Sequence, residues 1–88
     1  MEVEFDDDDL DRLETDAQFT AGFSQEVVRA YRKRMQQVRA FRDERDFYAV
    51  KALHFERLRG DREGQQSIRL NLQWRLILEI RGEHPCKV

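Results

Sequence analysis

The chain has 88 residues, which is enough for one domain, and we expect that domain to span residues 1–88. Hydrophobic residues make up 40% of the sequence and charged residues 39%, so the composition is that of a charged globular protein and excludes a disordered chain. No run approaches the roughly 18 apolar residues of a membrane span, and the single cysteine, Cys86, excludes an intramolecular disulfide. A cytoplasmic protein without membrane contact is therefore expected.

The charge is unevenly distributed along the chain. The formal net charge is −2, but residues 1–20 contain nine acidic residues and one basic residue, whereas the remainder contains fifteen basic and nine acidic residues. Thirteen of the sixteen basic residues are arginines, whose guanidinium groups suit bidentate binding of phosphate. The basic remainder therefore predicts an anionic partner, and RNA is the large anion that we favour.

The first half of the chain predicts one short strand, two helices and a weaker third helix. Met1–Phe5 alternates apolar and acidic residues, and the run Asp6–Asp9 would begin a short helix because carboxylates favour a helix N-terminus. The clearest helix covers residues 25–40, with Ser24 as its N-cap and apolar residues at spacings of three and four. A weaker helical segment covers residues 42–49.

The second half of the chain predicts strands. Residues 53–59 resemble a strand, and residues 60–64 form a turn with a glycine at each end. Residues 67–81 have an apolar residue at every even position and, except for Ile77, a polar residue at every odd position, which indicates a sheet with one buried face. Residues 85–88 resemble the start of a further strand. This order predicts an α+β fold with the helices packed on one face of a mostly antiparallel sheet.

The alternating stretch must turn back on itself. As one strand its fifteen residues would extend about 50 Å, at roughly 3.3 Å each, which is longer than so small a domain is wide. A three-residue loop at Asn71–Gln73 keeps all apolar even positions on one face and places Arg69 directly opposite Arg75. We expect Trp74 to pack in the core behind this hairpin.

The pairing of two arginines predicts an anion site. Like charges at directly opposite positions destabilise a sheet, so Arg69 and Arg75 are best explained by a phosphate bound between them. The alternative is a solvated sheet edge with partial pairing to nearby acidic residues. Cleavage of RNA without a metal needs a base, an acid and cations, and the arginines supply the cations. The nearest candidates for proton transfer are His54, Glu56 and Glu79.

Other kinds of site have little support. His54 and His84 are thirty residues apart and Cys86 stands alone, so no zinc-ligand spacing is present. No motif for a nucleophilic enzyme occurs either, and we expect neither a metal nor a cofactor. The basic face of the second helix is either solvated or binds RNA phosphates or an acidic partner; it comprises Arg29, Arg32, Lys33 and Arg39.

Two segments, Leu58–Gly64 (LRGDREG) and Ser67–Leu76 (SIRLNLQWRL), resemble the signature of the HigB toxins, which belong to the RelE/ParE superfamily. The resemblance implies a compact RelE-like α+β fold and a ribosome-dependent mRNA endoribonuclease that inhibits translation. It implies metal-independent cleavage by 2′-hydroxyl attack. It further implies a cognate HigA-like helix-turn-helix antitoxin, with operator DNA contacted only through the toxin–antitoxin complex.

The resemblance also implies roles for individual residues. Arg59 and Arg75 would be catalytic, whereas Arg62, Arg69 and Gln73 would bind substrate. Such toxins usually end with a further strand and an Asp-Tyr-His-like tail that takes part in proton transfer, and we expect this chain, which stops at residue 88, to lack both. Two alternatives stay open. One is a non-catalytic homologue that binds RNA, the ribosome or an antitoxin, and the other is a gyrase-directed toxin of the ParE type.

Overall fold

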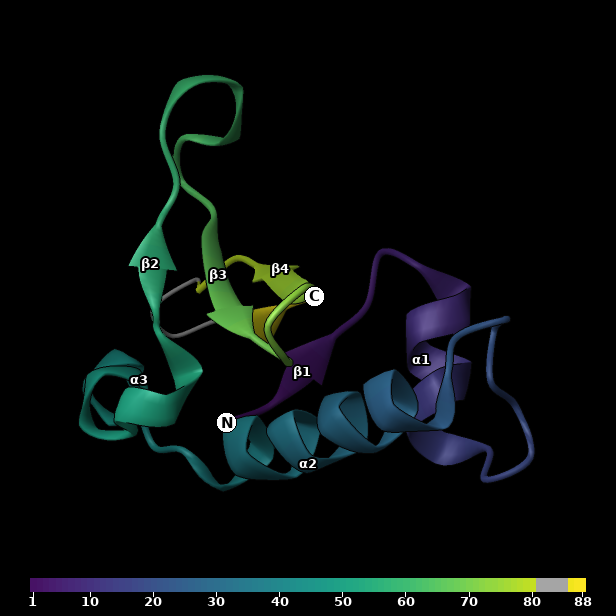
Figure 1. The fold of residues 1–88 in the computed structure, drawn as a ribbon. Coiled ribbons are helices and arrows are strands. Elements are labelled where there is room, and N and C mark those ends of the chain that lie inside the picture. The colour runs from purple at the N-terminus through teal and green to yellow at the C-terminus, as the bar shows by residue number, and fades with distance from the viewer. Residues whose placement is uncertain (81–85) are drawn as a thin grey trace.

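The computed structural model describes residues 1–80 and 86–88 (Figure 1). Of the helices in these ranges, none combines the length and apolar character needed to span a lipid bilayer. Three helices and the strands of an antiparallel sheet confirm the predicted α+β fold class. In chain order the elements are β1 (Val3–Glu4), α1 (Asp8–Thr15), α2 (Gln25–Ala40), α3 (Glu44–Ala49), the 3-10 turn η1 (Lys51–Leu53), β2 (Glu56–Arg57), the 3-10 turn η2 (Gly60–Arg62), β3 (Gln66–Arg69), β4 (Arg75–Leu78) and β5 (Cys86–Lys87).

The strands form two pairings of different kind. Strands β2, β3 and β4 make an antiparallel sheet in that order, and β1 pairs in parallel with β5. The parallel pair is extended by Val88, whose N–H donates to the Glu4 carbonyl at 2.7 Å. The start of a strand predicted at residues 85–88 corresponds to the two-residue strand Cys86–Lys87. Residues 81–85, which include His84 and the predicted end of the alternating stretch, lie outside the described residues.

The hairpin register is the predicted one. Arg69 pairs with Arg75 and the neighbouring position pairs Ile68 with Leu76. The loop at Asn71–Gln73 is closed by the Asn71 side chain, whose Oδ1 accepts hydrogen bonds from the N–H groups of Gln73 and Trp74, both at 2.9 Å. Asparagine is favoured in such turns because its side chain can bond backbone groups two and three residues ahead.

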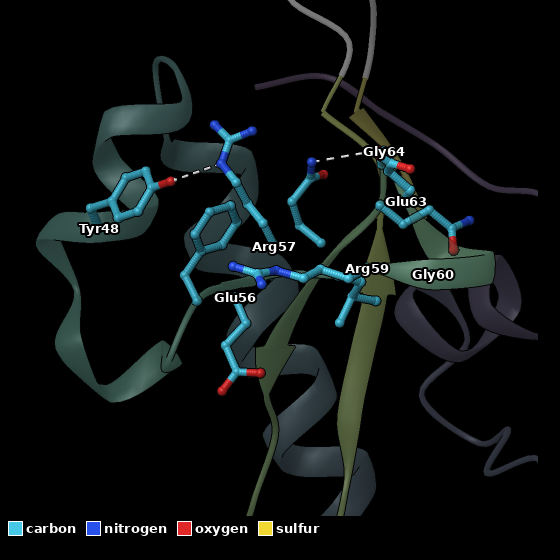
Figure 2. Close-up of a pocket in the computed structure, with 11 residues that line it drawn as sticks. Tyr48, Glu56, Arg57, Arg59, Gly60, Glu63 and Gly64 are labelled. Atoms are coloured by element: carbon cyan, nitrogen blue, oxygen red, sulfur yellow. Dashed lines mark hydrogen bonds between the residues drawn. The ribbon is translucent and has the colours of Figure 1, made fainter.

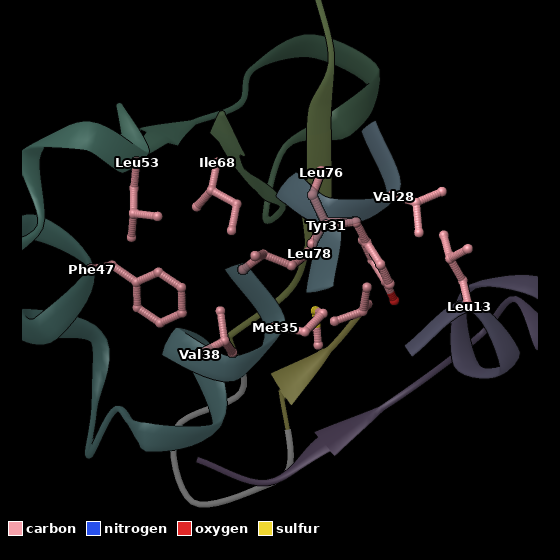
Figure 3. Close-up of a cluster of buried hydrophobic side chains, with 11 residues drawn as sticks. Leu13, Val28, Tyr31, Met35, Val38, Phe47, Leu53, Ile68, Leu76 and Leu78 are labelled. Atoms are coloured by element: carbon pink, nitrogen blue, oxygen red, sulfur yellow. The ribbon is translucent and has the colours of Figure 1, made fainter. Parts of the chain in front are cut away.

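Buried side chains from the helices and from strands β3 and β4 gather into one core (Figure 3). Helix α2 begins as predicted, with the Ser24 hydroxyl accepting a hydrogen bond from the Val27 N–H at 3.3 Å. Its apolar stripe contributes Met35 and Val38, which are completely buried. Because every second side chain of a strand points to the same face, the residues at even positions of β3 and β4 meet this stripe.

The two short helices begin at aspartates. The Asp7 carboxylate accepts a hydrogen bond from the Asp9 N–H at 2.8 Å, and the Asp43 carboxylate accepts one from the Arg45 N–H at 2.9 Å. A side-chain acceptor of this kind satisfies one of the free N–H groups at a helix N-terminus. Both expected helical segments are thus confirmed, with α3 starting two residues later than predicted because Asp43 is its cap.

The strand predicted at residues 53–59 is much shorter in the structure. Leu53 ends η1 and is completely buried, and only Glu56–Arg57 form β2. Between them His54 adopts a left-handed backbone conformation with φ of 45°. A strand cannot continue through a residue with positive φ, so the chain changes direction at His54 before it enters the sheet.

The prediction that Trp74 lies in the core is wrong. Its side chain is 44% exposed, and Leu72 at the tip of the hairpin is 91% exposed. Trp74 meets the Phe23 ring edge-on, with the ring centroids 5.3 Å apart. The alternating pattern identifies the buried face correctly at Ile68, Leu76 and Leu78, but Trp74 borders an open hollow between this face and the helices.

Candidate active site

Arg69 and Arg75 share one face of the sheet and meet at His54. Their directly opposite positions in β3 and β4 place both side chains on the same side. The Arg75 Nη2 donates a hydrogen bond to the His54 carbonyl, and the Arg69 Nη1 lies 3.2 Å from the His54 Nε2. We call these three residues the arginine–histidine cluster. The expected convergence of two arginines is therefore present, and it includes a histidine.

The Arg75 side chain is held in place by Ser67. The Arg75 Nε donates to the Ser67 hydroxyl at 2.9 Å, and its Nη2 also donates to the Ser67 carbonyl at 3.3 Å. Ser67 is only 1% exposed. Within the described residues these contacts and the bond to His54 occupy Nε and Nη2, which leaves Nη1 available to an anion. The arginine is thus oriented before any ligand arrives.

His54 faces both arginines because of its backbone conformation. Its φ of 45° turns the carbonyl toward Arg75 while the ring lies against Arg69. A guanidinium group only donates hydrogen bonds, so the His54 Nε2 is the acceptor in a hydrogen bond with Arg69. The His54 side chain is exposed and can therefore be reached by a substrate.

The end of β3 beside the cluster is fixed to the helices by Arg34. This arginine of α2 donates from Nε to the Arg69 carbonyl at 3.0 Å and from Nη2 to the Ala52 carbonyl at 3.4 Å. It therefore joins α2, the end of β3 and the turn that leads into His54. The arginine-rich composition suggested that the arginines bind a ligand. Arg34 instead holds the end of β3 and the turn at Ala52 against α2.

The two acidic candidates for proton transfer lie in different places. Glu56 pairs with Ser67 in the sheet register, so its exposed side chain emerges on the face that carries the arginine–histidine cluster. Glu79 instead lines a hollow of about 210 Å³ with Asp6 and Asp7. Glu56 is therefore the acidic candidate on the same face as the cluster.

Arg59 lies in a different hollow. It lines a cavity of about 900 Å³ together with Tyr48, Phe55 and Arg57. Figure 2 shows Arg59 with Tyr48 and Arg57. Arg57 pairs with Gln66, and successive residues of a strand point to opposite faces, so the Arg57 side chain lies on the face away from Ser67, while Glu56 also lines the cavity. Within the described residues, no hydrogen bond joins Arg59 to the arginine–histidine cluster. Its catalytic role stays a prediction.

One wall of the same cavity is held by an internal network. The Arg57 Nε donates to the Tyr48 hydroxyl at 3.3 Å, and its Nη2 donates to the Glu44 carboxylate. The hydrogen bond to Tyr48, together with the nearby negative charge of Glu44, raises the pKa of Arg57 above its ordinary value. Arg57 is thus a fixed, permanently charged part of this wall.

The two other predicted substrate-binding residues are exposed. Arg62 lies in η2, where its Nη1 is 3.5 Å from the Gln65 Oε1. Gln73 lies at the hairpin tip and lines a hollow of about 450 Å³ together with Arg69 and Arg34. Gln73 therefore lies in the same hollow as Arg69. The substrate-binding roles of Arg62 and Gln73 stay predictions.

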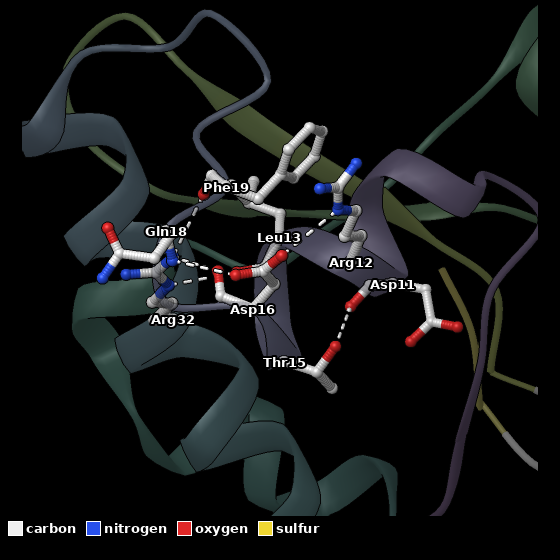
Figure 4. Close-up of polar contacts among 8 residues, drawn as sticks. All are labelled: Asp11, Arg12, Leu13, Thr15, Asp16, Gln18, Phe19 and Arg32. Carbon is white, nitrogen blue, oxygen red and sulfur yellow. Dashed lines mark hydrogen bonds and ion pairs between the residues drawn. The ribbon is translucent and has the colours of Figure 1, made fainter.

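The basic face of α2 is partly structural. Arg32 closes the C-terminal end of α1 by donating to the carbonyls of Leu13 and Asp16, both at 3.0 Å, and of Phe19 at 3.2 Å (Figure 4). Arg39 binds both carboxylate oxygens of Glu14, at 2.6 and 2.7 Å. Two of the arginines that suggested phosphate or partner binding are therefore used within the fold.

We searched the described residues for a group of side chains that could hold a metal ion. Among the described residues, no three or more His, Cys, Asp or Glu side chains lie close enough together to hold a metal ion. The chemistry of the cluster is that of cations beside a titratable ring.

Comparison with known protein families identifies one match. The family model described as "RelE-like toxin of type II toxin-antitoxin system HigB" matches residues 3–85. A search of curated proteins finds no matching relative. Because the match covers almost the entire chain and its α+β architecture agrees, the chain belongs to the HigB family of RelE-like toxins of type II toxin–antitoxin systems.

Proposed function

We propose that this toxin is an endoribonuclease that cleaves mRNA on the ribosome and thereby inhibits translation. The observation that carries the proposal is the arginine–histidine cluster, in which two cations and a titratable ring converge on one sheet face. Cleavage proceeds by attack of a ribose 2′-hydroxyl on the adjacent phosphorus, which needs no metal. The bond from phosphorus to the 5′-oxygen breaks, a 2′,3′-cyclic phosphate forms, and the leaving 5′-oxygen takes up a proton. The membership of the toxin family supports this activity class.

Arg75 stabilises the charge that develops on the phosphate. Its guanidinium group is already oriented by Ser67 and by the His54 carbonyl, so no reorganisation is needed when the negative charge grows. Arg69, directly opposite, binds the same phosphate from the neighbouring strand. An anion between the two also removes the repulsion between their like charges.

His54 is the proton acceptor for the 2′-hydroxyl. When Arg69 turns to the phosphate, the Nε2 atom that faced it becomes available as a base. We assign an assisting role in proton transfer to Glu56, whose pairing with Ser67 puts its side chain on the same sheet face. The proposal assigns binding to Gln73 as well, since it lines the hollow beside Arg69.

The partners follow from the same proposal. A type II toxin is paired with an antitoxin, and we assign to this one a HigA-like protein with a helix-turn-helix domain. The complex of the two, rather than the toxin alone, would contact operator DNA. The ribosome presents the mRNA, which places the activity in the cytoplasm.

The test is to map mRNA ends in cells that express the toxin. Primer extension is expected to reveal new 5′ ends within coding regions for the wild type and none for Arg75→Ala. Arg42→Ala is a matched control, because Arg42 is an exposed arginine between α2 and α3 that lies outside the cluster and outside the basic face of α2. Thermal unfolding of purified variants verifies the fold. Growth arrest by the wild type without new 5′ ends would instead identify a toxin that binds without cleaving.

A further inference from the structure

Arg34, in the middle of α2, joins two backbone segments that lead into the candidate active site. Its Nε donates to the Arg69 carbonyl at 3.0 Å, and its Nη2 donates to the Ala52 carbonyl at 3.4 Å. Arg69 is the last residue of β3, and Ala52 lies two residues before His54, in the turn η1. The Arg69 Nη1 and the His54 Nε2 meet at 3.2 Å. One guanidinium group therefore holds the backbone of both segments whose side chains make this contact.

The sheet itself does not connect these two segments. The pairing of β2 with β3 ends at Glu56 and Ser67, which are two residues short of His54 and of Arg69. Within the described residues, no backbone–backbone hydrogen bond joins η1 to β3. The left-handed backbone of His54 also turns the chain away from the direction of a strand. A side chain from α2 thus supplies a connection where the sheet provides none.

The Arg34 guanidinium group is held in a fixed orientation. Its Nη1 donates to the Gln37 Oε1 at 2.9 Å, so each of its three nitrogen atoms has an acceptor within the protein. The side chain is half-buried. Arg75 differs, because its contacts within the described residues use only Nε and Nη2. Arg34 lines the same hollow as Arg69 and Gln73, but its contacts favour a role in holding the chain over binding of phosphate.

The distance between His54 and Arg69 matters for the proposed reaction. The base must lie within hydrogen-bond reach of the 2′-hydroxyl while Arg69 binds the adjacent phosphate, and a misplacement of about 1 Å can cost roughly 10²-fold in rate. The contact also selects the tautomer of the neutral ring. Because the His54 Nε2 accepts a hydrogen bond, the proton of the neutral ring is on Nδ1. This tautomer is the one that allows Nε2 to act as a base.

We propose that Arg34 is a positioning residue for cleavage. By fixing the end of β3 and the turn η1 against α2, it holds His54 and Arg69 at their mutual distance and keeps the His54 Nε2 without a proton. Arg34 acts through these two residues and does not contact the substrate. The inference rests on the proposed nuclease function and deepens it.

The first test reads the tautomer of His54 by NMR and needs no RNA. The sequence contains two histidines, so the ring signals of His54 are identified by their loss in His54→Asn. At a pH at which the ring is neutral, ¹⁵N chemical shifts are expected to place the proton on Nδ1 in the wild type. Arg34→Gln is expected to shift the ring toward the Nε2–H form that free histidine prefers, whereas the exposed control Arg42→Gln leaves it unchanged. An unchanged tautomer in Arg34→Gln overturns the proposal.

The second test is a double-mutant cycle on single-turnover cleavage of ribosome-bound mRNA, which gives the maximal rate and the toxin concentration at half saturation. Arg34→Gln is expected to lower the maximal rate about 10- to 100-fold and to change half saturation less than about threefold, whereas Arg42→Gln changes neither. In the His54→Asn background, Arg34→Gln is expected to lower the rate by no more than about twofold, because residues that act as a unit are not additive. Equal losses of rate in both backgrounds indicate a general loss of structure and overturn the proposal.

Arg34→Lys guards against a variant that fails to fold. It keeps the charge, but one ammonium group cannot reproduce the fork that reaches the two carbonyls. Intermediate effects on the tautomer and on the rate are expected, and thermal unfolding verifies the fold of each variant. A wild-type tautomer and a wild-type rate in Arg34→Lys would show that the fork is not needed, which overturns the proposal.

The outcomes distinguish this proposal from the proposed nuclease activity. If the wild type leaves mRNA uncut, the nuclease activity is overturned, and the role of Arg34 in cleavage with it. The tautomer then still decides whether Arg34 fixes the contact between His54 and Arg69. If the wild type cleaves mRNA but the cycle is additive or the tautomer does not change, positioning by Arg34 is overturned and the nuclease activity stands.

Discussion

Ser67 and Arg75 are diagonal neighbours on adjacent strands, and the buried Ser67 hydroxyl accepts a hydrogen bond from the Arg75 Nε at 2.9 Å. The two residues are eight positions apart in the sequence, and no motif links them. In the structure Ser67 fixes the direction of the Arg75 guanidinium group. Removing the hydroxyl leaves the cation present and frees it to adopt other rotamers. Ser67 is therefore a positioning residue for the proposed phosphate site.

The variant Ser67→Ala is expected to lower cleavage about tenfold and to cost about 1–3 kcal/mol of stability, because a hydrogen bond to a charged group is lost. The measurements are toxin-dependent mRNA cleavage in a cell-free translation reaction and urea unfolding. Ser67→Thr keeps the hydroxyl and is expected to retain most of the activity. Full activity in Ser67→Ala would show that Arg75 needs no support from Ser67.

Replacement of His54 separates its ring from its backbone. His54 has a φ of 45°, a conformation that asparagine tolerates well, so His54→Asn should keep the carbonyl that binds Arg75. Loss of a general base lowers rates by roughly 10²–10⁴-fold, and a fall of this size in the cleavage rate is expected.

The control for this variant is its stability and its interaction with RNA. The midpoint of thermal unfolding and the affinity for ribosomes are expected to stay close to those of the wild type. A His54→Asn toxin that still cleaves at the wild-type rate would remove His54 from the mechanism and leave Glu56 as the candidate base on this face.

The hairpin register could be predicted from the sequence because two simple constraints coincide. Strict alternation in residues 67–80 fixes which side chains share a face, and the small size of the domain requires a turn within the stretch. Only an odd loop satisfies both, and a loop at Asn71–Gln73 places Arg69 opposite Arg75, as the structure confirms. Local patterns therefore sufficed for the central pair of the candidate site.

Other parts of the site depend on contacts that no local pattern contains. The ring of His54 reaches Arg69 only because η1 buries Leu53 and the next residue then adopts positive φ. Arg59 follows a strand of only two residues, so its position in sequence does not determine which face it joins. The exposure of Trp74 depends on how closely the helices pack against the end of the hairpin, which alternation does not encode.

Arg32 is expected to be important for stability rather than for binding. It donates hydrogen bonds to three carbonyls at and after the C-terminal end of α1, where backbone acceptors have no partner within the helix (Figure 4). Arg32→Ala should therefore lower the free energy of unfolding by about 1–3 kcal/mol, because hydrogen bonds from a charged, half-buried group are lost.

The exposed Arg29 on the same helix supplies the comparison. Arg29→Ala removes the same charge, and its effect on the free energy of unfolding should stay within roughly 0.5 kcal/mol. Urea unfolding of the two variants decides the matter. Equal effects would mean that the contacts of Arg32 with α1 add nothing beyond its charge.

Acid should destabilise the loops that follow Asp16 and precede α3. The pKa of Asp16 lies below its usual value of 3.8 because its carboxylate accepts a hydrogen bond from the Gln18 N–H and is paired with Arg12. The pKa of Asp43 is lowered below 3.8 in the same way, first by its hydrogen bonds with the Arg45 side chain and N–H.

A carboxyl group whose pKa is lower in the folded state contributes stability above its unfolded pKa and loses that contribution as the pH falls through the folded value. The difference in unfolding free energy between the wild type and Asp16→Asn is therefore expected to be constant above roughly pH 5 and to shrink as the pH falls toward 2. Urea unfolding across this range measures it. Asp8→Asn, at a carboxylate with no ion pair in the described chain, should give a difference that varies less with pH. A difference for Asp16→Asn that grows on acidification would contradict the assignment, since it would require the folded state to bind the proton more tightly than the unfolded chain.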